Sequence, residues 1–256
     1  MALFHTIFYR PIFNALIAAY HYLPVHDLGL AIIAVTILTL TVLFWPSLIQ
    51  VRSSQMLQEL QPKLKELQQK HKNNREELAR QTMALYRQHK FNPLSSCLPI
   101  IVQFPFFIAL YQVFISGLKI DPVTHLLAPE RLADLYGSLR DIYAAAPIVT
   151  TSFGFLDLSA TKNIVLAILV GGSQFLLTRL LAPKSTPPSV PGAKDERSAT
   201  SILRQMNYIT PFSFAFISYI LPAGLSLYYI TWNLFQIGQR QILARPKRPP
   251  TIESKP

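Results

Sequence analysis

Apolar stretches with few or no charges alternate with charged stretches along the chain. Residues 29–51 form the first apolar stretch. At about 1.5 Å per helical residue it is long enough to cross a bilayer core of roughly 30 Å. Further stretches of this kind are residues 93–118, 163–182, 206–222 and 223–241. The pattern predicts five transmembrane helices and therefore an all-α polytopic membrane protein.

Residues 52–92 separate the first two apolar stretches and are rich in lysine and arginine. Leucines recur there every three or four residues, which predicts one apolar helix face made of Leu57, Leu60, Leu64 and Leu67. Asn74, followed three residues later by Glu77, predicts the start of a second helix, whose apolar positions include Leu78 and Leu85. Pro62 predicts a bend or restart in the first helix. Residues 52–92 are thus predicted to form a helical hairpin outside the bilayer.

The distribution of basic residues predicts which segments face the cytoplasm. The hairpin, a linker at residues 183–205 and a tail at residues 242–256 carry more basic than acidic residues, whereas the loop at residues 119–162 does not. Five spans with the N-terminus outside and the C-terminus in the cytoplasm keep every basic-rich segment inside. Residues 1–28 contain an apolar stretch too short and too polar to span, so we expect an interfacial helix there.

Composition agrees with a membrane location. The chain has 256 residues, half of them hydrophobic, and a mean hydropathy of +0.29, which is more apolar than a soluble domain of this size. The formal net charge of +11 must lie outside the hydrocarbon. Cys97 is the single cysteine, which excludes a disulfide framework and a cysteine-rich metal site. The N-terminal residues lack a signal-peptide cleavage pattern and an organelle presequence composition, so we predict a bacterial cell (inner) membrane.

Uncharged polar side chains inside the predicted spans are the candidate functional residues. They are Thr36, Thr39, Ser47 and Gln50 on one face of the first span, with Leu40 at its edge, then Gln103, Gln174, Thr178, Tyr228, Thr231 and Trp232. In hydrocarbon an unsatisfied polar group costs several kcal/mol, so these groups need partners. Hydrogen bonds between helices would supply them, and so would a hydrated groove. For Tyr228 and Trp232, packing or anchoring at the membrane interface is a further explanation.

Four segments carry a more specific signal: residues 52–63 (RSSQMLQELQPK), 92–111 (NPLSSCLPIIVQFPFFIALY), 155–159 (FLDLS) and 222–229 (PAGLSLYY). In this order and spacing they resemble the YidC/Oxa/Albino family of membrane protein insertases. The resemblance covers roughly residues 29–241. It implies five transmembrane helices around a hydrophilic groove, with a cytoplasmic hairpin, and the insertion and folding of membrane proteins without nucleotide hydrolysis. No covalent enzyme activity, metal or other cofactor is expected.

One position departs from this family. Its members usually carry an arginine in the first span, facing a water-filled groove, and the corresponding residue here is Leu40. No arginine lies between Arg10 and Arg52. The resemblance therefore predicts a weaker preference for substrates whose translocated segment is acidic. Leu40→Arg should improve the insertion of such substrates.

The resemblance also implies partners: nascent membrane proteins, the lipid bilayer, the ribosome and a Sec-type translocon. The basic hairpin and tail would contact ribosomal RNA or anionic lipid, unless they are merely solvated. A channel or transporter is disfavoured because the spans carry few ionisable residues, and an intramembrane enzyme because zinc and nucleophile motifs are absent from the sequence. A chaperone that holds membrane proteins without inserting them remains open.

Overall fold

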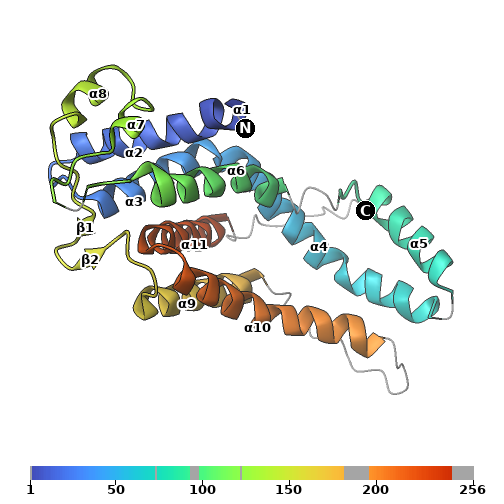
Figure 1. The fold of residues 1–256 in the computed structure, drawn as a ribbon. Coiled ribbons are helices and arrows are strands. Elements are labelled where there is room, and N and C mark those ends of the chain that lie inside the picture. The colour runs from blue at the N-terminus through green and yellow to red at the C-terminus, as the bar shows by residue number, and fades with distance from the viewer. Residues whose placement is uncertain (1, 73, 93–97, 122, 182–195, 244–256) are drawn as a thin grey trace.

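The computed structural model of the chain describes residues 2–72, 74–92, 98–121, 123–181 and 196–243 and is mostly helical (Figure 1). The first helices are α1 (Ala2–Phe4), η1 (His5–Tyr9), α2 (Arg10–Tyr22), α3 (Leu28–Val42), α4 (Phe44–Lys70) and α5 (Arg75–Gln88). Next come α6 (Leu98–Gln112), η3 (Val113–Gly117), α7 (Pro129–Leu132), α8 (Gly137–Tyr143), β1 (Thr151–Ser152) and β2 (Leu156–Asp157). The long helices α9 (Ile164–Leu181), α10 (Glu196–Ile220) and α11 (Ala223–Leu243) follow.

The predominance of helices agrees with the predicted all-α class. Within the described ranges, no helix combines the length and the hydropathy required of a membrane-crossing segment. The count of five spans stays a prediction.

The main hydrophobic core forms around α2, which packs against α3 (Figure 1). Phe13, Leu16 and Ile17 of α2 are fully buried, as are Leu28 and Ala31 of α3. Burying each large apolar side chain stabilises the fold by about 1.5–3 kcal/mol. The apolar face of α2 is therefore covered by protein, and contact of residues 1–28 with the membrane surface stays a prediction.

The first predicted span, residues 29–51, is divided between two helices. α3 ends at Val42 and α4 begins at Phe44, with Leu43 (φ −85°, ψ 10°) between them. Pro46 explains the break, because proline has no N–H to donate to the carbonyl of Val42. α4 then continues into the predicted hairpin, so the expected boundary at residues 51 and 52 is wrong for the helix.

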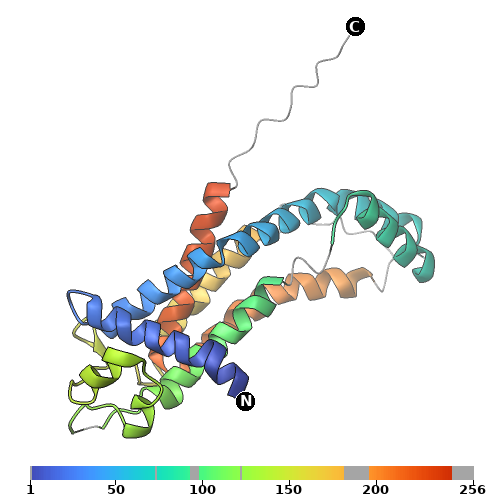
Figure 2. The ribbon, with the colours of Figure 1, turned by 90° about the horizontal axis from the view of Figure 1, so that it is seen from above.

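α4 and α5 pack against each other as the predicted helical hairpin. The Asn74 side chain caps α5 by accepting a hydrogen bond from the Glu77 N–H at 3.0 Å, as predicted. The contact contains Leu60, Leu85 and Phe91, with Met56, Leu64, Leu67 and Tyr86 around them. Of the predicted bend or restart at Pro62, the restart does not occur, because Pro62 lies inside α4. The helix as a whole follows a curved path, as a bend would produce (Figure 2).

Residues 119–162 fold into short elements beside α2 (Figure 2). Asn14 of α2 joins the two parts, because its amide donates to the Asp134 carbonyl at 2.9 Å and accepts from the Tyr136 N–H at 2.7 Å. His5 lies 3.2 Å from the Asp134 carboxylate. The strands β1 and β2 form an antiparallel pair in which Ser152 lies opposite Leu156. The region is thus a folded cap on the bundle.

The last three helices pack side by side, with α10 along α9 and α11 against both α9 and α3. α9 coincides closely with the third predicted span, residues 163–182. α10 begins at Glu196, so residues 196–205 are helical and not part of a linker. Their alanine, leucine, arginine and glutamine content favours a helix. The rest of the linker up to residue 195 and the tail from residue 244 lie outside the described residues.

Candidate functional site

α11 carries a strip of buried polar side chains in the centre of the bundle. Asn233, Gln236 and Gln239 recur every three residues and are 0%, 7% and 4% exposed. Ser226, two turns before Asn233, is also buried. Positions three or four residues apart lie on one side of a helix. α11 therefore presents amides and a hydroxyl to the helices around it.

Asn233 joins α11 to α9. Its Nδ2 donates to the Ser173 hydroxyl at 2.9 Å, and that hydroxyl donates to the Val170 carbonyl at 3.0 Å. One residue further along α9, the Gln174 amide lies 3.5 Å from the Thr178 hydroxyl, so these two predicted residues share a helix face. The α9–α11 contact is thus polar in the middle of an apolar bundle.

Two more hydrogen bonds connect α11 with the N-terminal half of the chain. The Ser47 hydroxyl of α4 donates to the Gln239 carbonyl oxygen at 2.5 Å. The Gln103 amide of α6 donates to the Tyr228 hydroxyl. Polar side chains of α4, α6 and α9 therefore contact α11, although these helices lie far apart in the sequence.

Some buried amide atoms of this site make no hydrogen bond within the part of the chain that the structure describes. They are the carbonyl oxygens of Gln174 and Asn233 and the amide nitrogen of Gln239. Leaving a buried polar atom unpaired costs about 1–3 kcal/mol. These atoms therefore provide one unused acceptor on α9 and, on α11, one unused acceptor and one unused donor.

Among the polar residues predicted on the first span, Ser47 reaches α11, whereas the two threonines form hydrogen bonds within their own helix. Thr36 and Thr39 each donate to a carbonyl one turn earlier in α3, at 2.6 and 2.8 Å. Thr231 of α11 does the same at 2.8 Å. Leu40 is buried, with 6% of its side chain exposed. Nothing is described for the side chain of Gln50.

The sequence interpretation missed the strongest polar positions. It chose Trp232, whose ring lies 5.6 Å from that of Tyr229, and passed over Asn233, Gln236 and Gln239. Three amides spaced by three residues in an apolar helix are a recognisable signal, because unpaired amides are expensive in hydrocarbon. In the sequence they precede the basic tail, and polar residues are common towards the end of a span.

Comparison with known proteins shows the family to which the chain belongs. The sequence profile of the family described as 60Kd inner membrane protein matches residues 20–249, which include every helix from α3 to α11. The chain belongs to this family. The predicted resemblance to the YidC/Oxa/Albino insertases is thereby confirmed. Membership in the 60Kd inner membrane protein family makes the chain a bacterial inner membrane protein, and the orientation of its termini stays a prediction.

Relatives in this family are about 31% identical to the chain over the residues that align. The protein named Membrane protein insertase YidC from Haemophilus influenzae is 31% identical over 221 residues, which cover 86% of this chain and 34% of the relative. The protein of the same name from Streptomyces avermitilis is 31% identical over 237 residues, covering 89% of this chain and 53% of the relative. The chain thus spans about a third to a half of the length of these relatives.

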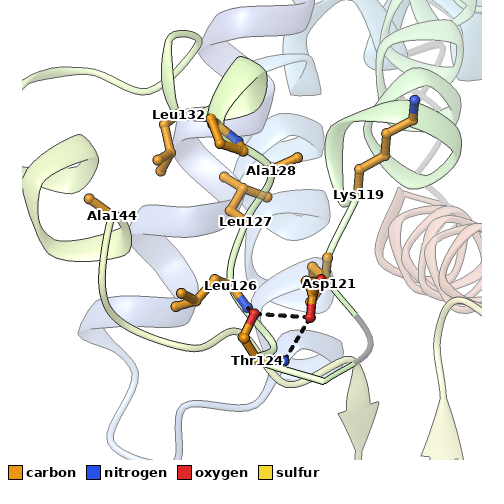
Figure 3. Close-up of a pocket in the computed structure, with 10 residues that line it drawn as sticks. Lys119, Asp121, Thr124, Leu126, Leu127, Ala128, Leu132 and Ala144 are labelled. Carbon is orange, nitrogen blue, oxygen red and sulfur yellow. Dashed lines mark hydrogen bonds between the residues drawn. The ribbon is translucent and has the colours of Figure 1, made fainter.

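A pocket of about 480 Å³ lies elsewhere, in the 119–162 cap (Figure 3). Its lining includes Lys119, Asp121, Thr124, Leu127 and Leu132. Hydrogen bonds from the Thr124 and Val123 N–H groups and the Thr124 hydroxyl hold the pKa of the Asp121 carboxyl below its usual value. The carboxylate oxygen that accepts these bonds closes a turn, so we assign this pocket no role in the polar site of α11.

Proposed function

We propose that this member of the 60Kd inner membrane protein family inserts integral membrane proteins and helps them fold. The insertion would proceed through a polar intramembrane groove and without nucleotide hydrolysis. Family membership supports the proposal, and so does the name insertase that its relatives carry. The chain spans only part of the length of those relatives, so insertase activity is a proposal for this chain.

The observation that carries the proposal is the set of buried amides between α9 and α11. Asn233 is fully buried, yet its carbonyl oxygen and that of Gln174 find no partner among the described residues. A purely structural contact in a membrane would be expected to satisfy both, since hydrocarbon offers no alternative partner. Water held between the helices would satisfy them, and a groove that opens at this contact would offer them to a substrate.

The groove would act by solvating the polar part of the substrate. A charge at the centre of a bilayer costs about 3 kcal/mol on insertion scales. The polar surface formed by Ser47, Gln103, Gln174, Asn233 and Gln239 would lower that barrier by supplying hydrogen bonds part-way across. The apolar segment of the substrate would then move into lipid, and its transfer at about 25 cal/mol per Å² would drive the step. Short helices would add local thinning of the bilayer.

The proposal includes the orientation and partners suggested by the sequence. Five spans would place the N-terminus outside and the α4–α5 hairpin and basic tail in the cytoplasm. Nascent membrane proteins are the proposed substrates. The ribosome and a Sec-type translocon are proposed partners, and the basic segments would contact ribosomal RNA or anionic lipid headgroups.

Site-specific photo-crosslinking tests the route of the substrate. A photoreactive phenylalanine analogue at Trp232 would be expected to crosslink to a nascent single-span substrate. The same analogue at Phe212 of α10, which is 75% exposed, is the matched control and should crosslink to lipid instead. Equal crosslinking of substrate at both positions would contradict a groove at α11.

A holding chaperone is the second candidate, because the same polar surface could bind a membrane protein without inserting it. Such a chaperone would give the crosslink at Trp232 but would leave the substrate accessible to protease. Insertion by the purified protein separates the two functions.

A further inference from the structure

Residues 150–162 contact two helices that begin far apart in the sequence. On one side they bind the start of α3. The Ser152 hydroxyl, which is fully buried, accepts a hydrogen bond from the Gly29 N–H at 2.7 Å. The Phe153 N–H donates to Asp27 Oδ2, also at 2.7 Å. β1 is thus attached to the first turn of α3 through both a side chain and the backbone.

On the other side the same segment binds the turn between α10 and α11. The Ala223 N–H donates to the Ala160 carbonyl and the Gly224 N–H to the Leu158 carbonyl, each at 2.9 Å. The Lys162 N–H donates to the Tyr219 carbonyl at 2.7 Å. The first two bonds satisfy N–H groups at the start of α11, and the third satisfies a carbonyl at the end of α10; a helix cannot satisfy either kind internally.

Asp27 divides its two oxygens between separate tasks. Oδ1 caps α3 by accepting the Leu30 N–H at 3.0 Å, and Oδ2 accepts the Phe153 N–H. Capping alone needs one oxygen, which serine or threonine would supply. The second oxygen is therefore specific to the contact with residues 150–162.

The backbone of this segment is held in an uncommon shape. Phe153 has a φ of +54°, in the left-handed region that bulky residues seldom occupy, and Gly154 follows with φ +79°. Such conformations persist where the surroundings fix them. At Gly29 a Cβ atom would lie 3.0 Å from both the Cβ and the hydroxyl oxygen of Ser152, so a side chain there would press on Ser152 and disturb the contact.

We propose that residues 150–162 form an intramolecular clasp that fixes the start of α3 to the start of α11, with Asp27 and Ser152 as its positioning residues. The two helices then keep one relative position at this end of the bundle. The clasp accounts for the 155–159 motif, whose Leu158 is fully buried and supplies a carbonyl to α11. The inference does not depend on the proposed insertase activity.

Hydrogen exchange in lipid nanodiscs, followed by mass spectrometry, tests whether the clasp bonds exist. Ser152→Ala removes the acceptor of the Gly29 N–H, so that amide should exchange about tenfold faster, as expected for the loss of one buried hydrogen bond. Asp27→Ser keeps the cap on α3 but removes the acceptor of the Phe153 N–H, so the Phe153 amide should exchange faster while the Leu30 amide does not. Thr124→Ala lies in the 119–162 cap of the bundle but outside the clasp, so it should change the exchange of neither the Gly29 amide nor the Phe153 amide.

Spin labels test whether the clasp positions the helices. After Cys97 is replaced by serine, cysteines at the exposed positions Val25 and Ile220 carry the labels. The clasp predicts a single narrow distance distribution, and Asp27→Ser combined with Ser152→Ala should broaden it or add a longer distance. Faster exchange without any change in the distance distribution would overturn the positioning role, and unchanged exchange would overturn the clasp itself. Neither the hydrogen exchange nor the spin-label experiment measures insertion, so failure of the clasp and failure of the proposed function can be told apart.

Discussion

Asn233→Leu separates a groove from ordinary packing at the α9–α11 contact. Leucine has the same branching and the same number of side-chain heavy atoms as asparagine, but it is bulkier and carries no polar atoms. The substitution removes the hydrogen bond from Nδ2 to the Ser173 hydroxyl, and it also removes the buried Oδ1 for which no described residue is a partner. These two changes act on stability in opposite directions, and their sizes can be compared.

The loss of the Ser173 bond is small. Hydrogen bonds between membrane helices contribute about 0.6 kcal/mol on average and at most about 1.7. Removing an unpaired buried oxygen recovers about 1–3 kcal/mol. The bulkier leucine at this fully buried position adds an overpacking cost of about 1–3 kcal/mol, which offsets that gain. Asn233→Leu should therefore change the free energy of unfolding by less than about 1.7 kcal/mol in either direction. Insertion per folded molecule should nevertheless fall several-fold, because the groove loses a polar group.

Two measurements on the same preparations distinguish a role of Asn233 in the groove from a role in packing alone. Unfolding in mixed detergent micelles measures stability, and protease protection of a substrate in liposomes measures insertion. Ser218→Ala is the matched control, because it removes a buried hydroxyl bond to Ser226 at 2.7 Å between α10 and α11, away from the α9 contact. A loss of more than about 1.7 kcal/mol with insertion unchanged would show that Asn233 only packs the helices together.

Three further outcomes are expected. Gly224→Ala should lower the yield of folded protein and its melting temperature, because the new Cβ would clash with Cε1 of Phe114. Such overpacking costs about 1–3 kcal/mol. An unchanged melting temperature would contradict the close contact. Burial raises the pKa values of the Asp27 and Asp157 carboxyls, but hydrogen bonds outweigh it and leave both pKa values below the usual value. Both carboxylates therefore stabilise the fold above the unfolded pKa of about 3.9, and this stability is lost as pH falls through the lower folded pKa. Thermal unfolding measured from pH 7 to pH 3 should show a falling melting temperature. Asp27→Asn should make the melting temperature depend less on pH. Leu40→Arg should improve insertion of substrates with acidic translocated segments relative to neutral ones, as protease protection of paired substrates would reveal, and no change or a decline would reject this.

The local features of the helices could be predicted from the sequence. Asn74 and Glu77 marked the start of α5, because a cap depends only on residues within one turn. The α4 positions Leu60 and Leu64 and the α5 position Leu85 gave the contact within the hairpin, since periodicity reports which side of a helix is apolar. Family membership followed from motifs whose order is fixed along the chain.

Long-range contacts could not be predicted in this way. Nothing in the sequence near Ser47 indicates that its hydroxyl meets Gln239, and the bond between Ser152 and Gly29 also joins residues more than a hundred positions apart. The break at Leu43 was missed because hydropathy runs unchanged across it, although Pro46 was visible. The sequence therefore indicates polar side chains in the bundle but not which of them contact one another.

Reconstitution of the purified protein into liposomes tests the central claim most directly. A small single-span substrate is added without nucleotide, and its protection from protease is compared with that in empty liposomes. Insertion by this chain predicts protection well above the empty control. Protection equal to the control would contradict insertion by the chain alone and would favour a holding chaperone or a required partner.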